Sequence, residues 1–312
     1  MNNFIFSLNA TVPIFLLIVI GYVMQKLHMT NETFIKTANK FNFTITLPAL
    51  LFKDISSTNL RSFFDVKYVL FCAIVTSISF FTIWGLSKLL IKDKTITGAF
   101  VQASFRGSAA VLGIAFIQNI YGDSGMAPLM IIGTVPLYNM YSVIVLTFES
   151  NNGSKKTISE AFINICKNPI IISIFLGMIS AAIGINYPVI FDKTLSSVAA
   201  LASPLALICI GAAFKGSQAI AKIKPTVISS LIKLVILPLI FLPVAIRLGY
   251  TDSKLVALIV MLAAPTTASC YIMAQSMGND EVLTSSIVVT TTFFSSITLT
   301  ALVFILKCMN LI

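Results

Sequence analysis

Hydrophobic positions fill most of the chain in long runs, and polar residues gather in short stretches between them. Ten runs are each long enough to cross a bilayer as an α-helix, which takes roughly 20 mostly apolar residues. Their approximate limits are residues 5–25, 34–53, 67–90, 95–120, 125–148, 168–186, 189–214, 224–248, 252–277 and 282–307. The pattern therefore predicts an all-α integral membrane protein with ten transmembrane helices in contact with membrane lipid.

The composition agrees with this prediction and narrows the possible functions. Hydrophobic residues make up 57% of the 312 positions and charged residues only 10%, whereas a soluble domain carries about 25% charged residues. Ten helices use nearly the whole length, so the function should lie inside the helical bundle. The five cysteines form no CxxC pair and His28 is the single histidine, which predicts no metal site and no cofactor.

The net charge of +10 does not indicate nucleic-acid binding, because no basic arm or aromatic-basic patch lies outside the runs. Twelve Lys and Arg residues flank one side of the predicted spans and seven flank the other. The positive-inside rule makes the twelve-charge side cytoplasmic and places both termini outside the cell (inner) membrane. No positive charge precedes the first run and Lys26 follows it, so we expect a retained helix and not a signal peptide.

The longest polar connection, residues 149–166, divides the runs into five and five. Halves with an odd number of spans enter the membrane from opposite sides, which is typical of an inverted repeat. We therefore expect a first five-helix repeat over residues 1–150, a cytoplasmic loop over 151–166 and a second repeat over 167–312. A constant offset of 156 residues supports the repeat: it pairs Pro13 with Pro169, Gly21 with Gly177, Pro48 with Pro204 and Gly122 with Gly278.

The fourth run carries Arg106 near its middle, followed by Gly107 and Ser108. A charge at this depth costs a few kcal/mol or more unless it faces protein or water. A glycine beside it allows the helix to break, and a broken helix exposes N–H and C=O groups that can hold a ligand. The alternative is that Arg106 has only a structural partner or reaches the membrane surface.

The ninth run is the repeat mate of the fourth and contains Pro265, Thr266 and Thr267 at a matching depth. Proline removes a backbone donor and interrupts the helix, although a plain kink would have the same signature. Two interrupted helices at equivalent places in an inverted repeat indicate a transporter binding site. We predict that these three residues bind substrate together with Arg106, Gly107 and Ser108.

The charges inside the predicted spans indicate an anionic substrate. Arg106 can hold a carboxylate through two hydrogen bonds, and Lys233 is a second positive charge at membrane depth. No Asp or Glu lies at the centre of a span, which argues against cation antiport. Asn42 in the second run and Asn139 in the fifth are further candidates, since a polar residue here either lines a cavity or bonds a neighbouring helix.

Three stretches resemble the auxin efflux carrier family, and in particular its bacterial branch of malate and malonate carriers: LPALLF, SFRGSAAVLGIAF followed by IYGDSG, and APTTASCYIMAQSMGND. The resemblance covers essentially the whole chain. It implies a fold like that of bile-acid symporters and cation–proton antiporters, in which spans 1, 2, 6 and 7 form a scaffold. Spans 3–5 and 8–10 would form a transport domain, with helices 4 and 9 crossing at the site. Family members are often homodimers that carry organic anions.

The crossing departs from the family pattern at three positions. Gly107 stands where plant members usually have proline, Ser108 where bacterial relatives often have asparagine, and Ala115 where they often have proline.

These features predict a secondary transporter for a small organic anion, such as a carboxylate of the malate or malonate type, that works by alternating access. A sodium-coupled symporter of the bile-acid type, an auxin-like monocarboxylate carrier and a membrane ligand sensor are the alternatives. An enzyme is not expected, because the sequence has no HExxH motif, no paired carboxylates and no nucleophile beside a histidine.

Overall fold

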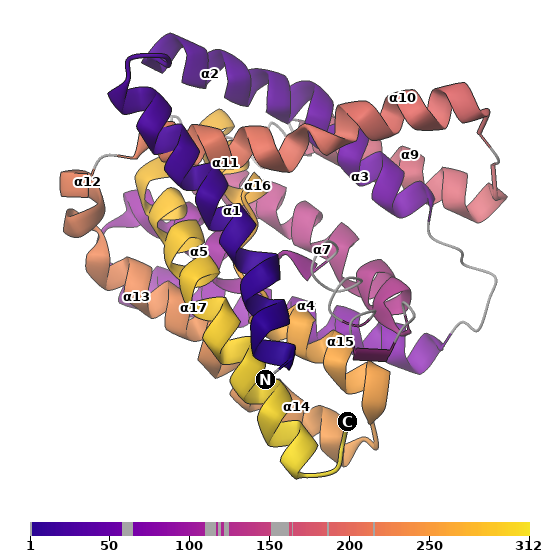
Figure 1. Cartoon of the computed structure of the whole chain (residues 1–312). Helices are drawn as coiled ribbons and strands as arrows, with labels where there is room; N and C mark the ends of the chain where they lie inside the picture. Colours follow the sequence, from indigo (N-terminus) through magenta and orange to yellow (C-terminus); the bar gives the residue numbers. More distant parts are fainter. Residues whose placement is uncertain are drawn as a thin grey trace.

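Helices make up all of the regular structure in the described part of the chain (Figure 1). The computed structural model describes residues 2–57, 65–109, 117, 120, 121, 125–150, 162, 163, 165–185, 187–214 and 216–312. Much of the second half of the predicted fourth span, with Ala115 and Gly122, lies outside these ranges, as does most of the loop 151–166.

The helices follow the predicted hydrophobic runs closely, and two of those runs are interrupted. The α-helices are α1 (Asn2–Lys26), α2 (Glu32–Phe41), α3 (Leu47–Ser56), α4 (Val66–Leu90), α5 (Thr97–Phe105), α7 (Ala127–Phe148), α9 (Pro169–Ile183), α10 (Val189–Ala200), α11 (Ala202–Ala213), α12 (Gly216–Ala221), α13 (Ile223–Leu231), α14 (Leu237–Arg247), α15 (Asp252–Ala263), α16 (Ser269–Ser276) and α17 (Glu281–Cys308). A π-helical turn at Asn42–Thr46 joins α2 to α3, and another at Ile232–Ile236 joins α13 to α14.

Five helical segments of the described chain are long and apolar enough to cross a membrane: Val66–Leu90, Ala127–Phe148, Val189–Ala213, Ile223–Arg247 and Glu281–Cys308. Their outer faces carry large exposed apolar side chains such as Leu89 and Ile190, each 82% exposed. A soluble monomer rarely shows such a surface, and lipid covers it in a membrane protein. The multi-pass membrane protein that the sequence predicts is therefore supported by the fold.

Side-chain oxygens begin several of the helices. Asn31 accepts a hydrogen bond from the N–H of Phe34 at the start of α2, and Asp65 accepts one from Tyr68 at the start of α4. Asn168 caps α9 immediately before Pro169, a position where proline loses no helical bond. These caps satisfy amide groups that a helix end leaves without partners, so the helix starts are encoded locally.

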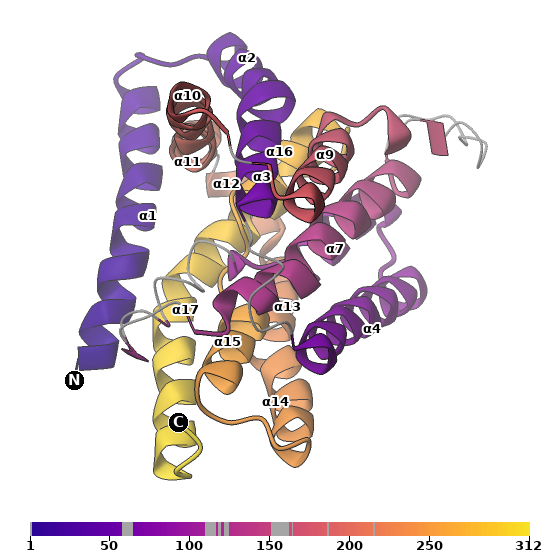
Figure 2. The same ribbon diagram turned by 90° about the vertical axis from the view of Figure 1, so that its right-hand side faces the viewer.

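The broken helices lie in the middle of the bundle. Every residue of α5 is buried, and so is every residue of α15 from Leu255 to Ala263. α7 and α17 pack against both of them. In Figure 2, α3, α9, α10 and α11 lie together in the upper part, and α4, α13, α14 and α15 in the lower part. The residues that break the helices therefore face protein and not lipid.

Glycines allow the closest approach between helices. A Cβ on Gly21 of α1 would overlap the carbonyl of Ile208 in α11, and one on Gly177 of α9 would lie 3.2 Å from the carbonyl oxygen of Phe52 in α3. Small residues commonly bring membrane helices together in this way. The offset of 156 residues relates Gly21 to Gly177 and also Phe52 to Ile208, so both contacts are made at equivalent places.

We predict that Gly211→Ala destabilises the protein by about 1–3 kcal/mol, because overpacking forces backbones apart. The new Cβ would overlap the carbonyl of Ile18 in α1. Gly85→Ala is the matched control, since a Cβ there has no heavy atom within 4 Å. Thermal unfolding of the detergent-solubilised variants measures the difference. Equal melting temperatures for the two variants would contradict the close packing of α1 on α11.

Candidate functional site

Two helices break at the places that the sequence predicts. α5 ends at Phe105 and the backbone of Arg106 is extended, with φ −87° and ψ 132°. α15 ends at Ala263, and Ala264 is extended with φ −62° and ψ 149°. Proline disfavours a helical conformation in the residue before it, so Pro265 explains the second break. The first break has no proline among residues 97–109 and depends on contacts with the rest of the bundle.

The two breaks touch each other. The N–H of Ser108 donates to the carbonyl oxygen of Pro265 at 2.9 Å, and the Thr266 hydroxyl donates to the carbonyl of Ala103 in α5 at 2.8 Å. The N–H of Thr266 donates to the Thr291 hydroxyl of α17 at 3.0 Å. The interrupted backbones therefore supply hydrogen bonds to one another at the centre of the bundle.

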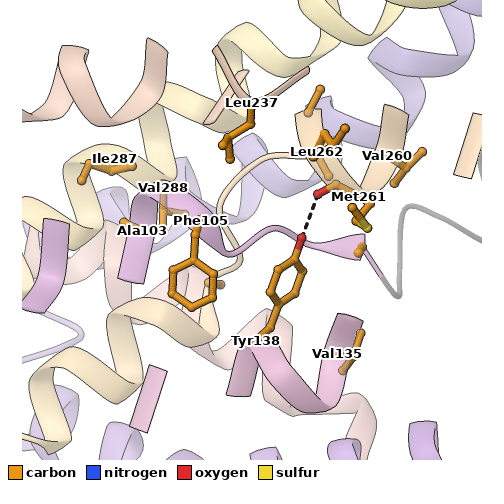
Figure 3. Close-up of a cluster of buried hydrophobic side chains, with 14 of the residues drawn as sticks. Ala103, Phe105, Val135, Tyr138, Leu237, Val260, Met261, Leu262, Ile287 and Val288 are labelled. Carbon is orange, nitrogen blue, oxygen red and sulfur yellow. Dashed lines mark hydrogen bonds between the residues drawn. The ribbon is translucent and has the colours of Figure 1, made fainter. Parts of the chain in front are cut away.

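Tyr138 of α7 closes one side of this crossing (Figure 3). Its hydroxyl donates to the carbonyl oxygen of Met261 at 2.9 Å, and its ring meets the ring of Phe105 edge-on at a centroid distance of 5.7 Å. Gly107 lies directly against the second broken segment, because a Cβ on it would be 3.2 Å from the carbonyl oxygen of Ala264. The same Cβ would be 2.8 Å from Lys233 Nζ. A larger residue at Gly107 would push the two segments apart.

Arg106 is buried, with 4% of its surface exposed, and its hydrogen-bond partners are uncharged. Nη2 donates to Asn139 Oδ1 at 2.7 Å and to Ser269 Oγ at 2.8 Å. Nη1 donates to Met273 Sδ at 2.7 Å and to Ser142 Oγ at 3.4 Å. These dipoles hold the guanidinium in place, and none of the four acceptors carries a negative charge.

Other contacts fix the acceptors of Arg106 in their orientation. Asn139 donates its amide to the carbonyl of Val135, which turns its Oδ1 toward Arg106. Ser142 donates its hydroxyl to the carbonyl of Tyr138, so its remaining lone pairs face the guanidinium. The predicted candidates Arg106 and Asn139 are therefore direct partners.

A pocket of about 60 Å³ lies beside the crossing; we call it the Arg106 pocket. Residues from α3, the first break, α7, the start of α11 and the second break line it: Leu47, Leu50, Leu51, Asp54, Arg106, Gly107, Ser108, Ala109, Val135, Tyr138, Asn139, Ala202, Ser203, Thr267 and Ser269. Five of the eight candidate residues are thus brought together there, namely Arg106, Gly107, Ser108, Asn139 and Thr267.

The other three candidates lie next to the Arg106 pocket but do not line it. Pro265 and Thr266 instead form hydrogen bonds that join the two broken segments. Asn42 is fully buried, and its amide donates to the carbonyl of Ala202 at 2.8 Å. Asn42 therefore bonds a neighbouring helix, which is one of the two roles that the sequence left open for it.

Three residues that line the Arg106 pocket were not among the candidates chosen from the sequence: Asp54, Ser203 and Ser269. Asp54 and Ser203 reach the pocket from α3 and from the start of α11, and their spacing to Arg106 in the sequence is large. Ser269 lies two residues after Thr267 and shares a hydrogen bond with its hydroxyl at 3.2 Å. The run of hydroxyls in residues 266–269 was the one local signal that could have found it.

A second pocket, of about 220 Å³, lies farther along the same helices; we call it the Lys36 pocket. Its lining includes Gln25, Glu32, Ile35, Lys36, Ala212, Ala213, Gln218, Tyr271, Gln275, Glu281, Val282 and Ser285. The two pockets share no lining residue. Asn39 of α2 contacts two lining residues of the Lys36 pocket, because its amide donates to the Tyr271 hydroxyl at 3.3 Å and to Gln275 Oε1.

Comparison with known proteins agrees with this architecture. The family model described as "Membrane transport protein" matches residues 6–303. An uncharacterized transporter, YfdV, of Escherichia coli (strain K12) is 26% identical over 283 residues, covering 86% of this chain and 88% of that protein. A putative malonate transporter of Rhizobium meliloti (strain 1021) is 23% identical over 306 residues, covering 95% and 94%.

We predict that Thr266→Val lowers the free energy of unfolding by about 0.5–1.5 kcal/mol, the usual range for a hydrogen bond between membrane helices. Valine keeps the shape and loses the bond to Ala103. Thr194→Val is the control, because the Thr194 hydroxyl is exposed and bonds only within its own helix. Unfolding by SDS titration measures both variants. A loss for Thr194→Val as large as for Thr266→Val would mean that the crossing bond contributes nothing.

Proposed function

The chain belongs to the family of membrane transport proteins that includes the auxin efflux carriers, and from that membership we propose that it carries a small organic anion with one or two carboxylates. It is a transporter and not an enzyme. The observation that carries the proposal is a buried arginine with uncharged partners at the edge of a small pocket between two broken helices.

A carboxylate is the ligand that best fits Arg106. The guanidinium has five N–H donors in a planar fork, and a carboxylate accepts two of them side by side. The four Nη hydrogens already have protein acceptors, so the carboxylate would displace part of this set, of which Ser142 at 3.4 Å is the longest contact. Thr267 and Ser269 flank the pocket at the N-terminal end of α16, where the helix dipole is positive. Both features stabilise a negative charge, and the hydroxyls of Ser108 and Thr267 can orient the rest of the molecule.

The size of the Arg106 pocket favours a small substrate. Pockets for drug-sized ligands measure roughly 300–1,000 Å³, and this one is about 60 Å³. A bile acid or an indole carboxylate would need far more room than a three- or four-carbon dicarboxylate. Among the alternatives raised by the sequence, the malonate or malate type therefore has the strongest support, and the relative named as a putative malonate transporter agrees with it.

We also propose that residues 1–150 and 167–312 are inverted repeats joined by a cytoplasmic loop. Equivalent contacts support this arrangement, because α1 packs on α11 and α9 packs on α3. Gly21 lies against the carbonyl of Ile208 in the first pair, and Gly177 lies against the carbonyl of Phe52 in the second. The offset of 156 residues relates the two glycines and also the two carbonyls. In this proposal α1, α2–α3, α9 and α10–α11 form the scaffold. The transport domain consists of α4, α5, α7, α13–α14, α15–α16 and α17.

The two pockets suggest how the site alternates between the sides of the membrane. The Arg106 pocket reaches Asp54 near the end of α3, and the Lys36 pocket reaches Gln25 and Glu32 at the opposite end of the scaffold helices. With both termini outside the inner membrane, the first pocket faces outward and the second inward. Asn39 then joins the scaffold to α16 of the transport domain, and this contact must break when the site moves.

We predict that Arg106→Ala reduces malonate uptake into proteoliposomes at least about 30-fold, since removing one partner of a buried charge pair costs 2–5 kcal/mol. Arg106→Lys should retain part of the uptake, because it keeps the charge and loses the fork. Arg247→Ala is the control at an exposed position in the last turn of α14. Labelled mono- and dicarboxylates should be assayed together. Uptake by folded Arg106→Ala at normal affinity would refute the role of Arg106.

We predict that Asn39→Ala opens the path between the Arg106 pocket and the cytoplasmic side. A cysteine at Thr267, in a chain whose five cysteines are replaced, should then react several-fold faster with an impermeant maleimide from the cytoplasmic face. Asn31→Ser, which keeps a capping oxygen on the same helix, is the control. If labelling stays confined to the external face in both variants, Asn39 does not separate the two pockets.

A further inference from the structure

Lys233 lies in the π-helical turn between α13 and α14, and its side chain is completely buried. Its Nζ donates to the carbonyl oxygen of Met261 at 3.1 Å and to that of Phe105 at 3.3 Å. The ammonium also lies 5.8 Å from the centroid of the Tyr138 ring. Lys233 therefore reaches the crossing from a third element and touches both broken helices.

Both carbonyls are among those that the helix breaks leave without helical partners. Met261 O would accept from the N–H of residue 265 in a continuous helix, and Pro265 has no N–H. Phe105 is the last residue of α5, so its carbonyl has no following turn to bond. Phe105 and Met261 are also separated by the repeat offset of 156 residues. One ammonium thus binds equivalent ends of the two half-helices.

The charges at this point balance. Each helix carries roughly half a negative charge at its C-terminal end, so two ends present about one negative charge, which one ammonium matches. In transporters with broken helices, the C-terminal ends of half-helices and the unwound carbonyls coordinate the coupling Na⁺ or H⁺. Lys233 already occupies that place, and the Gly107 backbone packs against its Nζ and Cε.

We propose that the Lys233 ammonium is a built-in cation that replaces a coupling sodium ion at the crossing, so that this carrier works without sodium. The inference rests on the proposed function only in treating the crossing as the transport site. It also gives the two buried cations different roles, since Lys233 binds the helix ends and Arg106 would bind the substrate.

The first test compares salts for the wild-type protein. Malonate uptake and the melting temperature should be the same in NaCl and in choline chloride at equal ionic strength. Uptake that depends on Na⁺, or a melting temperature that Na⁺ raises above its value in choline, would overturn the proposal.

The second test removes the ammonium. Lys233→Met, which keeps the length of the side chain without its charge, should reduce uptake about tenfold or more in either salt. Lys233→Ala leaves space beside two negative helix ends, and Na⁺ or Li⁺ should raise its melting temperature by several degrees relative to choline. Lys307→Met is the matched control, because Lys307 is exposed in the last turn of α17.

The outcomes distinguish this inference from the proposed function. Melting temperatures involve no substrate, so a rise for Lys233→Ala in Na⁺ or Li⁺ relative to choline, with none in wild type, supports the built-in cation even if no carboxylate is carried. Uptake by Lys233→Met equal to that of Lys307→Met would overturn it. If Lys233→Ala yields no folded protein, the wild-type salt comparison and Lys233→Met decide the matter.

Discussion

The structure depends on the need to satisfy backbone polar groups that lie away from water. A helix that stops inside a membrane leaves N–H and C=O groups unpaired, and each costs several kcal/mol in hydrocarbon. Here two such stops are placed against each other, so that Ser108 bonds Pro265 and Thr266 bonds Ala103. Tyr138 and Lys233 donate to the carbonyl of Met261, and Lys233 also donates to the carbonyl of Phe105. An irregular backbone is tolerated at this depth because it is buried in protein or lines the Arg106 pocket.

This arrangement explains why the charge of Arg106 lies where it does. Arg106 is the first residue after α5, and its extended backbone carries the side chain out of the helix and toward α7 and α16. A continuous helix would point the same side chain toward its own preceding turn. The break therefore has two effects, since it frees backbone groups for the crossing and aims a guanidinium at the Arg106 pocket. Gly107 allows both, because without a side chain it lets the backbone at Ala264 approach closely.

Much of the architecture could be predicted from the sequence because its causes are local. Apolar runs set the helix ranges and Pro265 sets one break, and both can be read locally. Pro and Gly coincidences at a fixed offset predict the repeat that we propose. The partners of Arg106 and Lys233 could not be predicted in the same way. Arg106 bonds Ser269, which is 163 residues away, and Lys233 bonds a carbonyl 128 residues away. The same holds for Asn42, which bonds a carbonyl 160 residues away. The groups at the crossing that the proposed repeat would relate are the backbone carbonyls of Phe105 and Met261, which have unlike side chains and leave no trace in a residue pattern.

The separation of the two buried cations has a consequence for the charge that crosses the membrane. The ammonium of Lys233 is matched by two helix ends, so the empty site carries the single charge of Arg106. A monoanionic carboxylate would neutralise it, and a dianion would leave one negative charge. Moving a neutral site through a low-dielectric layer costs least, because each uncompensated charge loses solvation. A dicarboxylate that binds with one proton would therefore load the carrier to neutrality, with the substrate itself supplying that proton. This balance counts only the charges of the proposed transport domain; Asp54 also lines the Arg106 pocket, but from α3 of the proposed scaffold.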